Sequence, residues 1–182
     1  MTELANPRSE SWESFYVIVG SSGAALIGLQ FVVITLIAGM RRRTSADTIN
    51  AFGTPTVVHL AGALLVSAIM SMPWPSLIPM SVALVLCGVG GLAYGLIVIA
   101  RTRRQTDYTP VWDDWLWYAI VPSSLYSALA LSAFLLRSTS RIAPFVIGAT
   151  ALGLLLLGIR NAWDSLVHMV AAGSHRDASK PH

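Results

Sequence analysis

The stretch Ile142–Ala172, IAPFVIGATALGLLLLGIRNAWDSLVHMVAA, joins an apolar run long enough to cross a membrane to a group of polar side chains near its end. On a helix that turns about 100° per residue, Arg160, Asp164 and His168 follow one another at i, i+4 and i+8, with Asn161 beside them. Because charge is costly in hydrocarbon, this face is expected to contact protein or water rather than lipid. The other apolar runs are expected to pack around it.

The composition is that of a membrane protein. Of the 182 residues, 54% are hydrophobic and 12% are charged, and the mean hydropathy is +0.64. Ordinary soluble domains are about 25% charged. We therefore predict an all-α, polytopic transmembrane bundle of about five membrane-spanning helices, with the lipid bilayer as its surroundings.

The predicted organisation is one transmembrane domain, 14–172, between two tails. The tail at 1–13 is expected to be short and exposed, and the tail at 173–182 to be disordered. The predicted spans are about 15–40, 55–72, 77–100, 115–136 and 142–161, the last with an amphipathic extension to 172. The second span is expected to begin at Thr54-Pro55, because threonine is a good cap and proline suits the first helical position.

Arginine clusters between the spans predict the orientation. Three arginines, Arg41–Arg43, follow the first span, and three more, at 101, 103 and 104, follow the third, whereas the connection 72–76 has no charge. Basic loops face the cytoplasm. The N-terminus is therefore expected outside and the C-terminus in the cytoplasm.

Small residues and one amide mark the first span. Gly20, Gly23 and Gln30 share a helical face, so another backbone can approach closely there. The Gln30 amide then needs a partner off that face. It is interpreted either as part of a packing seam or as a pore or substrate contact.

Two further packing features lie in the third and fourth spans. Gly91 and Gly95 form a GxxxG pair, which is typical of close helix contact in membranes. Pro122 removes a backbone donor within the fourth span, so a kink is predicted there. Kinked membrane helices occur at transport sites as well as in ordinary bundles.

Polar residues of the second and last spans are predicted to meet at the cytoplasmic face. His59 lies near the start of the second span, and Arg160, Asn161, Asp164 and His168 lie near the end of the last. Two interpretations stay open: a helix-internal pair of Arg160 with Asp164, or a charged mouth in which the histidines titrate between about pH 5 and 8.

Several function classes lack the residues that they need. Cys87 is the only cysteine, so neither an intrachain disulfide nor a cysteine metal site is available. No HExxH motif, phosphate-binding glycine loop or serine–histidine–acid set is present. We therefore expect no enzyme activity and no cofactor. The arginines lie in short clusters between apolar runs, as topology determinants do, so nucleic-acid binding is not expected either.

The stretches GSSGAALIGLQFVVITLIAG (20–39) and GIRNAWDSLV (158–167) resemble segments of small, uncharacterised bacterial inner-membrane proteins. The resemblance covers about a quarter of the chain. It implies a multi-pass protein of the bacterial inner membrane and carries no motif tied to a reaction.

Three hypotheses about function follow. The first is a homo-oligomeric ion channel or transport pore for ions or protons, with a charged cytoplasmic mouth, since one chain is too thin to enclose a wide pore. The second is a non-transporting membrane module that binds or positions a partner protein. The third is a haem- or metal-binding membrane protein that uses His59 and His168.

Overall fold

The structure, a computed structural model, describes residues 7–40, 46–102, 112–136 and 142–177, and these ranges contain no strand. Its elements are α1 (Pro7–Met40), α2 (Ala46–Ser71), α3 (Leu77–Thr102), α4 (Trp112–Trp115), the π-helical turn η1 (Leu116–Ile120), α5 (Val121–Leu135) and α6 (Ala143–Asp177). The five apolar stretches Ser11–Leu36, Thr54–Ser71, Leu77–Ala100, Leu116–Leu135 and Ala143–Val167 are each long enough to cross a membrane. The predicted all-helical fold with five membrane-length helices is thus confirmed.

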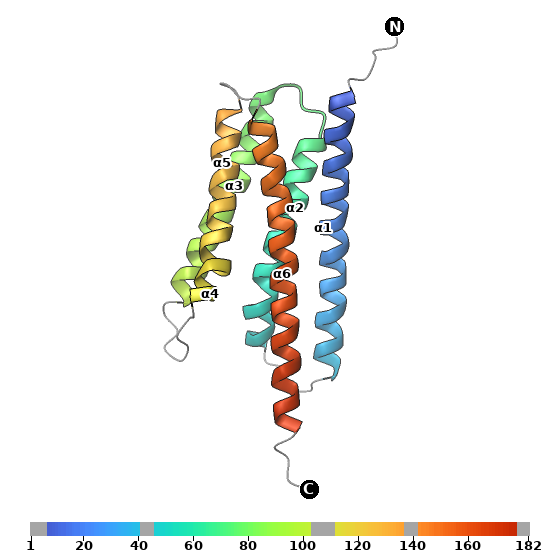
Figure 1. Cartoon of the computed structure of the whole chain (residues 1–182), viewed down its shortest axis with the longest axis vertical. Coiled ribbons are helices and arrows are strands. Elements are labelled where there is room, and N and C mark those ends of the chain that lie inside the picture. The colour runs from blue at the N-terminus through green and yellow to red at the C-terminus, as the bar shows by residue number, and fades with distance from the viewer. Residues whose placement is uncertain (1–6, 41–45, 103–111, 137–141, 178–182) are drawn as a thin grey trace.

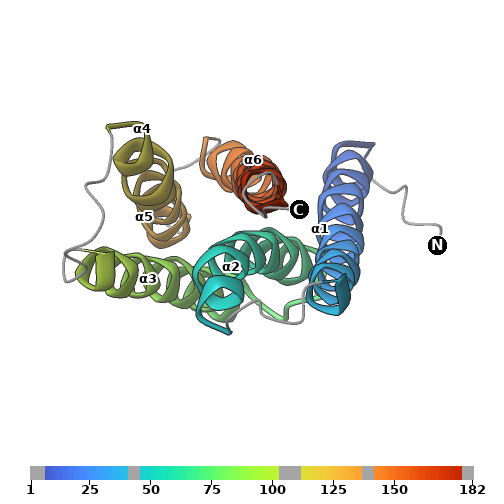
Figure 2. The same cartoon turned by 90° about the horizontal axis from the view of Figure 1, so that it is seen from below.

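The helices form a bundle in which α6 holds the central place (Figure 1). Seen along the bundle, α5, α6 and α1 lie in one row, and α3 and α2 lie on the other side (Figure 2). The most extensive helix contacts are those of α2 with α6, α1 with α2, and α3 with α5. Helix α6 thus packs against α1, α2 and α5, whereas α3 packs mainly against α5 and α2, so the prediction that the other spans surround this stretch holds only in part.

The core is filled by aliphatic side chains and two tyrosines, Tyr16 and Tyr126. Leu84 of α3, Leu129 of α5 and Leu154 of α6 are fully buried, and the Tyr126 ring lies among them. The Tyr126 ring packs against α3 at Gly91. A Cβ at this position would overlap the ring, so only glycine leaves room for it. The packing of the core thus depends on the pairing of a large residue, Tyr126, with a glycine, Gly91.

Glycines also let α1 approach α2. A Cβ on Gly20 would lie 3.0 Å from the Ser67 Cβ, and one on Gly23 would lie 3.2 Å from the Leu60 carbonyl oxygen. Both distances are tighter than ordinary van der Waals contact. These two glycines therefore lie in the kind of seam that was predicted for this face of α1.

Three of the helices extend beyond the spans that were predicted for them. Helix α1 begins at Pro7, within the expected tail 1–13, and α6 continues to Asp177, within the expected tail 173–182. Proline is tolerated in a first turn because its missing N–H has no helical partner there. Helix α2 begins at Ala46 and contains Pro55 in its interior, so Thr54-Pro55 is not a helix start. The apolar part of α2 nevertheless begins at Thr54.

The irregularity predicted at Pro122 takes the form of a π-helical turn just before it. The N–H of Val121 donates to the Leu116 carbonyl, five residues back, and α5 then starts with Pro122 in its first turn. The Ser124 hydroxyl donates to the Ile120 carbonyl oxygen at 2.8 Å. The wider turn therefore places the proline where no backbone donor is needed.

Candidate functional site

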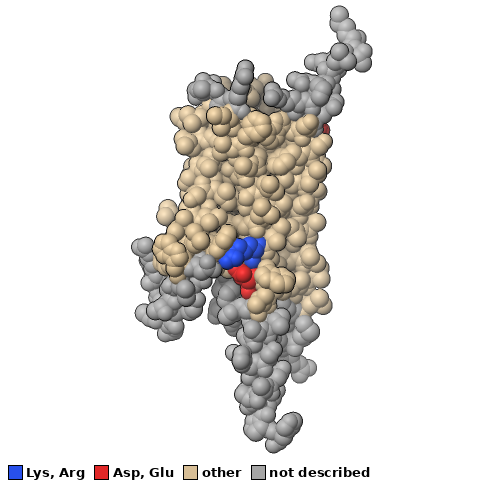
Figure 3. Space-filling view, in the orientation of Figure 1, with Lys and Arg blue, Asp and Glu red and all other residues tan. Residues whose placement is uncertain are grey.

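The ion pair predicted on α6 is formed. Arg160 Nη1 lies 3.7 Å from Asp164 Oδ2, and the two side chains are 31% and 38% exposed. The guanidinium also stacks on Trp117 of η1, with Cζ 3.9 Å from the ring centroid. The basic and acidic surfaces adjoin on this face of the molecule (Figure 3).

Two contacts fix Arg160, so a charge swap should restore only part of the stability. We expect Asp164→Asn to cost under about 1 kcal/mol, as partly exposed ion pairs do. Arg160→Leu should cost more, because a cation–π contact contributes about 0.5–2 kcal/mol in addition. The double variant Arg160→Asp, Asp164→Arg should regain the ion pair and not the Trp117 contact. Thermal unfolding in detergent checks this, and complete recovery would show that Trp117 contributes nothing.

His59 lies in the core and not at a charged mouth. It is 3% exposed, and its Nδ1 is 3.3 Å from the Tyr126 hydroxyl across the interface of α2 and α5. The two rings are tilted against each other with centroids 5.9 Å apart. The structure thus does not support the prediction that His59 belongs to a charged cytoplasmic mouth, because its ring faces Tyr126 of α5.

His59 and His168 are also far apart along the bundle. A Cβ on Gly158 of α6 would lie 3.4 Å from the Leu60 backbone nitrogen, which places Gly158 level with the residue after His59. His168 is ten residues further along α6, about 15 Å by helix rise. The side chain of His168 lies outside the described residues. Since metal–histidine bonds are about 2.0–2.1 Å long, this offset does not favour one ion held by both histidines.

Asn161 faces the protein interior rather than an open mouth. It is 1% exposed, and neither its amide oxygen nor its amide nitrogen has a hydrogen-bond partner among the described residues. Its backbone carbonyl accepts a 2.8 Å hydrogen bond from Ser165. The polar residues of α6 are therefore divided: Arg160 and Asp164 lie at the surface and Asn161 lies inside.

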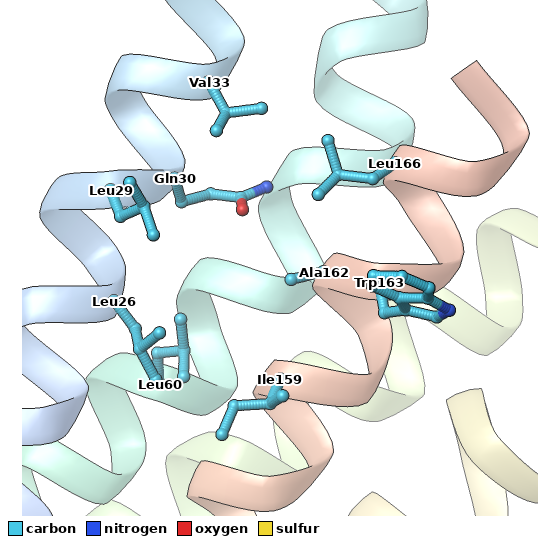
Figure 4. A pocket seen from close by; sticks show the side chains of 9 residues that line it. All are labelled: Leu26, Leu29, Gln30, Val33, Leu60, Ile159, Ala162, Trp163 and Leu166. Carbon is cyan, nitrogen blue, oxygen red and sulfur yellow. The ribbon is translucent and has the colours of Figure 1, made fainter. Parts of the chain in front are cut away.

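Gln30 lies in a pocket between α1, α2 and α6 (Figure 4). The cavity has a volume of about 180 Å³, and Gln30 is the single polar side chain in its lining. Its other lining residues are Leu26, Leu29, Val33, Leu60, Ile159, Ala162, Trp163 and Leu166. Gln30 is 5% exposed and points across the cavity towards α6. None of the eight other lining side chains can accept a hydrogen bond from its amide N–H groups.

Aromatic packing joins α1 to α6 near the N-terminal ends of both helices. Trp12 stacks edge-on against Phe145, with ring centroids 5.0 Å apart, and a Cβ on Gly148 would lie 2.9 Å from the Trp12 ring. The two helices are thus held together near their N-terminal ends. Further along, leucine, valine, isoleucine and alanine side chains of α1 and α6 line the cavity together with Leu60 of α2 (Figure 4).

Sequence reasoning identified Gln30 but not the pocket. An amide in a long apolar run is a visible signal, whereas Ala162 and Trp163 carry no mark that distinguishes them from other residues of α6. Among the residues described, no group of three histidine, cysteine, aspartate or glutamate side chains could hold a metal ion. No protein-family model, curated protein or solved structure was found to match the chain.

Proposed function

We propose that this multi-pass membrane protein is a non-transporting module that binds a partner molecule within the bilayer. The observation that carries the proposal is the pocket of α1, α2 and α6, with the buried Gln30 amide aimed into it. A buried polar group without a hydrogen bond costs free energy unless a ligand or water supplies one. The pocket therefore gains stability when a hydrogen-bonding molecule enters it.

Exposed residues at the rim of the pocket indicate that a ligand would enter it from the lipid bilayer. Leu29 is 58% exposed and Trp163 is 67% exposed, and both lie within membrane-length apolar stretches. A helix with its side chains is about 10–12 Å across, so a cavity of about 180 Å³ is too small to admit one. A small molecule, or one part of a larger lipid, is thus a better occupant than a helix of a partner protein.

Filling the pocket from inside should remove the partner. Ala162→Phe places a ring where the cavity lies, and Ala149→Phe is a matched control on an exposed face of the same helix. We expect native mass spectrometry of the full chain in lipid nanodiscs to find a bound non-protein mass on the unaltered protein and on Ala149→Phe. Ala162→Phe should lack it. Equal retention by folded Ala162→Phe, or no bound mass on the unaltered protein, would reject the proposal.

A homo-oligomeric ion channel or transport pore is the second candidate. The observation that favours it is the ion pair of Arg160 with Asp164, which keeps about a third of its surface exposed although it lies within the apolar stretch Ala143–Val167. In an assembly, such a pair would form the charged mouth of a shared path. Folded protein in vesicles that passes no ions or protons at any pH would reject this candidate.

We also propose that the N-terminus lies outside and the C-terminus lies in the cytoplasm of a bacterial plasma membrane. The arginines at 41–43 follow α1, and those at 101, 103 and 104 lie at the end of α3 or just after it. Basic loops are retained on the cytoplasmic side. In this orientation, the pocket lies in the inner leaflet.

A further inference from the structure

We propose that the pocket of α1, α2 and α6 binds an uncharged, membrane-soluble molecule with an apolar chain and a carbonyl group, and that isoprenoid quinones are its ligand class. This inference rests on the proposed binding function and names the chemistry of the ligand.

The amide sets the polar part of the ligand. A glutamine side chain offers two N–H donors and one carbonyl acceptor. Figure 4 shows the end of the Gln30 side chain inside the cavity, among leucine and alanine side chains. A ligand carbonyl that accepts from this amide would supply a hydrogen bond that no other side chain of the lining can accept.

The lining sets the charge of the ligand. Eight of its nine residues are apolar, and none carries a charge. A charged ligand would therefore meet no compensating group, at a high cost in an apolar medium. The indole of Trp163 adds an aromatic wall at the rim, and aromatic rings favour stacking with flat rings. A neutral ring that carries a carbonyl fits these surroundings.

The depth of the pocket distinguishes quinones from phospholipids. Gln30 lies six residues before Leu36, where the apolar stretch of α1 ends, and Leu60 lies six residues after Thr54, where that of α2 begins. Each interval is about 9 Å of helix rise. The ester carbonyls of phospholipids lie in the interfacial region outside the hydrocarbon core. A carbonyl on a molecule without a charged headgroup reaches Gln30 more readily.

The volume shows how much of the ligand enters. Pockets that enclose a whole drug-sized ligand measure about 300–1,000 Å³, whereas this one measures about 180 Å³. Only one end of the molecule is thus enclosed. The exposed rim at Leu29 and Trp163 lets the apolar chain continue into the bilayer.

Fluorescence of Trp163 tests the ligand class. The full chain is placed in nanodiscs of quinone-free phospholipid and titrated with decylubiquinone. The Trp163 signal is the difference between the unaltered protein and Trp163→Phe. We expect a saturable quenching of this signal, with affinity about 3- to 10-fold weaker in Gln30→Met, which removes the amide and keeps the length of the side chain. Saturable quenching should vanish in Ala162→Phe and persist in Ala149→Phe.

Each of the other results of these experiments would overturn one part of the proposal. Equal affinity of Gln30→Met, with unchanged thermal stability, would remove the amide from recognition. Absence of saturable quenching, together with a bound phospholipid that Ala162→Phe loses in mass spectrometry, would overturn the quinone class and leave the proposed binding function standing. Absence of both saturable quenching and any pocket-dependent bound mass would overturn the ligand and the proposed function together.

Discussion

Replacing Gly91 by alanine is expected to lower the thermal unfolding midpoint of the protein markedly. The added Cβ would overlap the ring of Tyr126, which is 2% exposed and enclosed on all sides. Neither partner has room to move, because the neighbouring Gly88 already has the backbone of Ala130 within 2.9 Å of its Cβ position. Overpacking a well-filled core costs about 1–3 kcal/mol and occasionally more. Thermal unfolding in detergent or nanodiscs measures this cost.

The adjacent Gly90 is a matched control. No atom lies within 4 Å of its Cβ position, and it faces outward from α3. Gly90→Ala should be neutral or slightly stabilising, since alanine favours the helix by up to about 1 kcal/mol over glycine. Equal unfolding midpoints of Gly91→Ala and Gly90→Ala would contradict the packing of Tyr126 against α3.

Replacing Tyr126 by alanine should have the largest effect of all. Its ring contacts α3 at Gly91, and its hydroxyl lies 2.9 Å from the Cβ position of Gly62 on α2 and 3.3 Å from His59 Nδ1. Removal of a large buried aromatic side chain costs about 3–5 kcal/mol. Tyr126→Phe keeps the ring and leaves His59 without this partner, which should cost about 1–3 kcal/mol. Chemical or thermal unfolding of both variants separates packing from hydrogen bonding.

A double variant links the two effects. In the background of Tyr126→Ala, the change Gly91→Ala should cost little, because the ring that it would overlap is gone. The free energies of the two single changes should thus fail to add, as residues in contact do. Strict additivity would show that Gly91 and Tyr126 act independently and that the contact between them is misplaced.

Hydropathy was enough to predict the five membrane-length helices, but not which side of each faces protein. Lipid tails are as apolar as leucine, so a membrane helix needs no polar face and its sequence carries little signal for burial. Gly91 and Gly95 show this limit. Their spacing predicts one seam, yet only Gly91 lies against Tyr126, whereas the Cβ position of Gly95 has just the Ser123 hydroxyl oxygen, at 3.8 Å.

Helix boundaries and the pocket were beyond sequence reasoning for related reasons. Proline at a helix start and proline inside a membrane helix look alike in sequence, so Pro55 alone could not reveal the turns that precede it in α2. The pocket is lined by residues of three helices, so its presence depends on how α1, α2 and α6 pack together, which hydropathy does not show. The sequence identified Gln30 as an unusual residue, but it did not indicate the pocket around its side chain.

The odd number of membrane-length helices has a consequence for the two ends of the chain. If every one of the five crosses, the ends meet different compartments whichever way the protein is inserted. Helix α6 would then be a continuous rod of about 52 Å, by the rise of its 35 residues, that runs through the core and on into one of those compartments. A molecule bound to that part of α6 would act on the same helix that carries one wall of the pocket, so we expect its binding to alter the pocket.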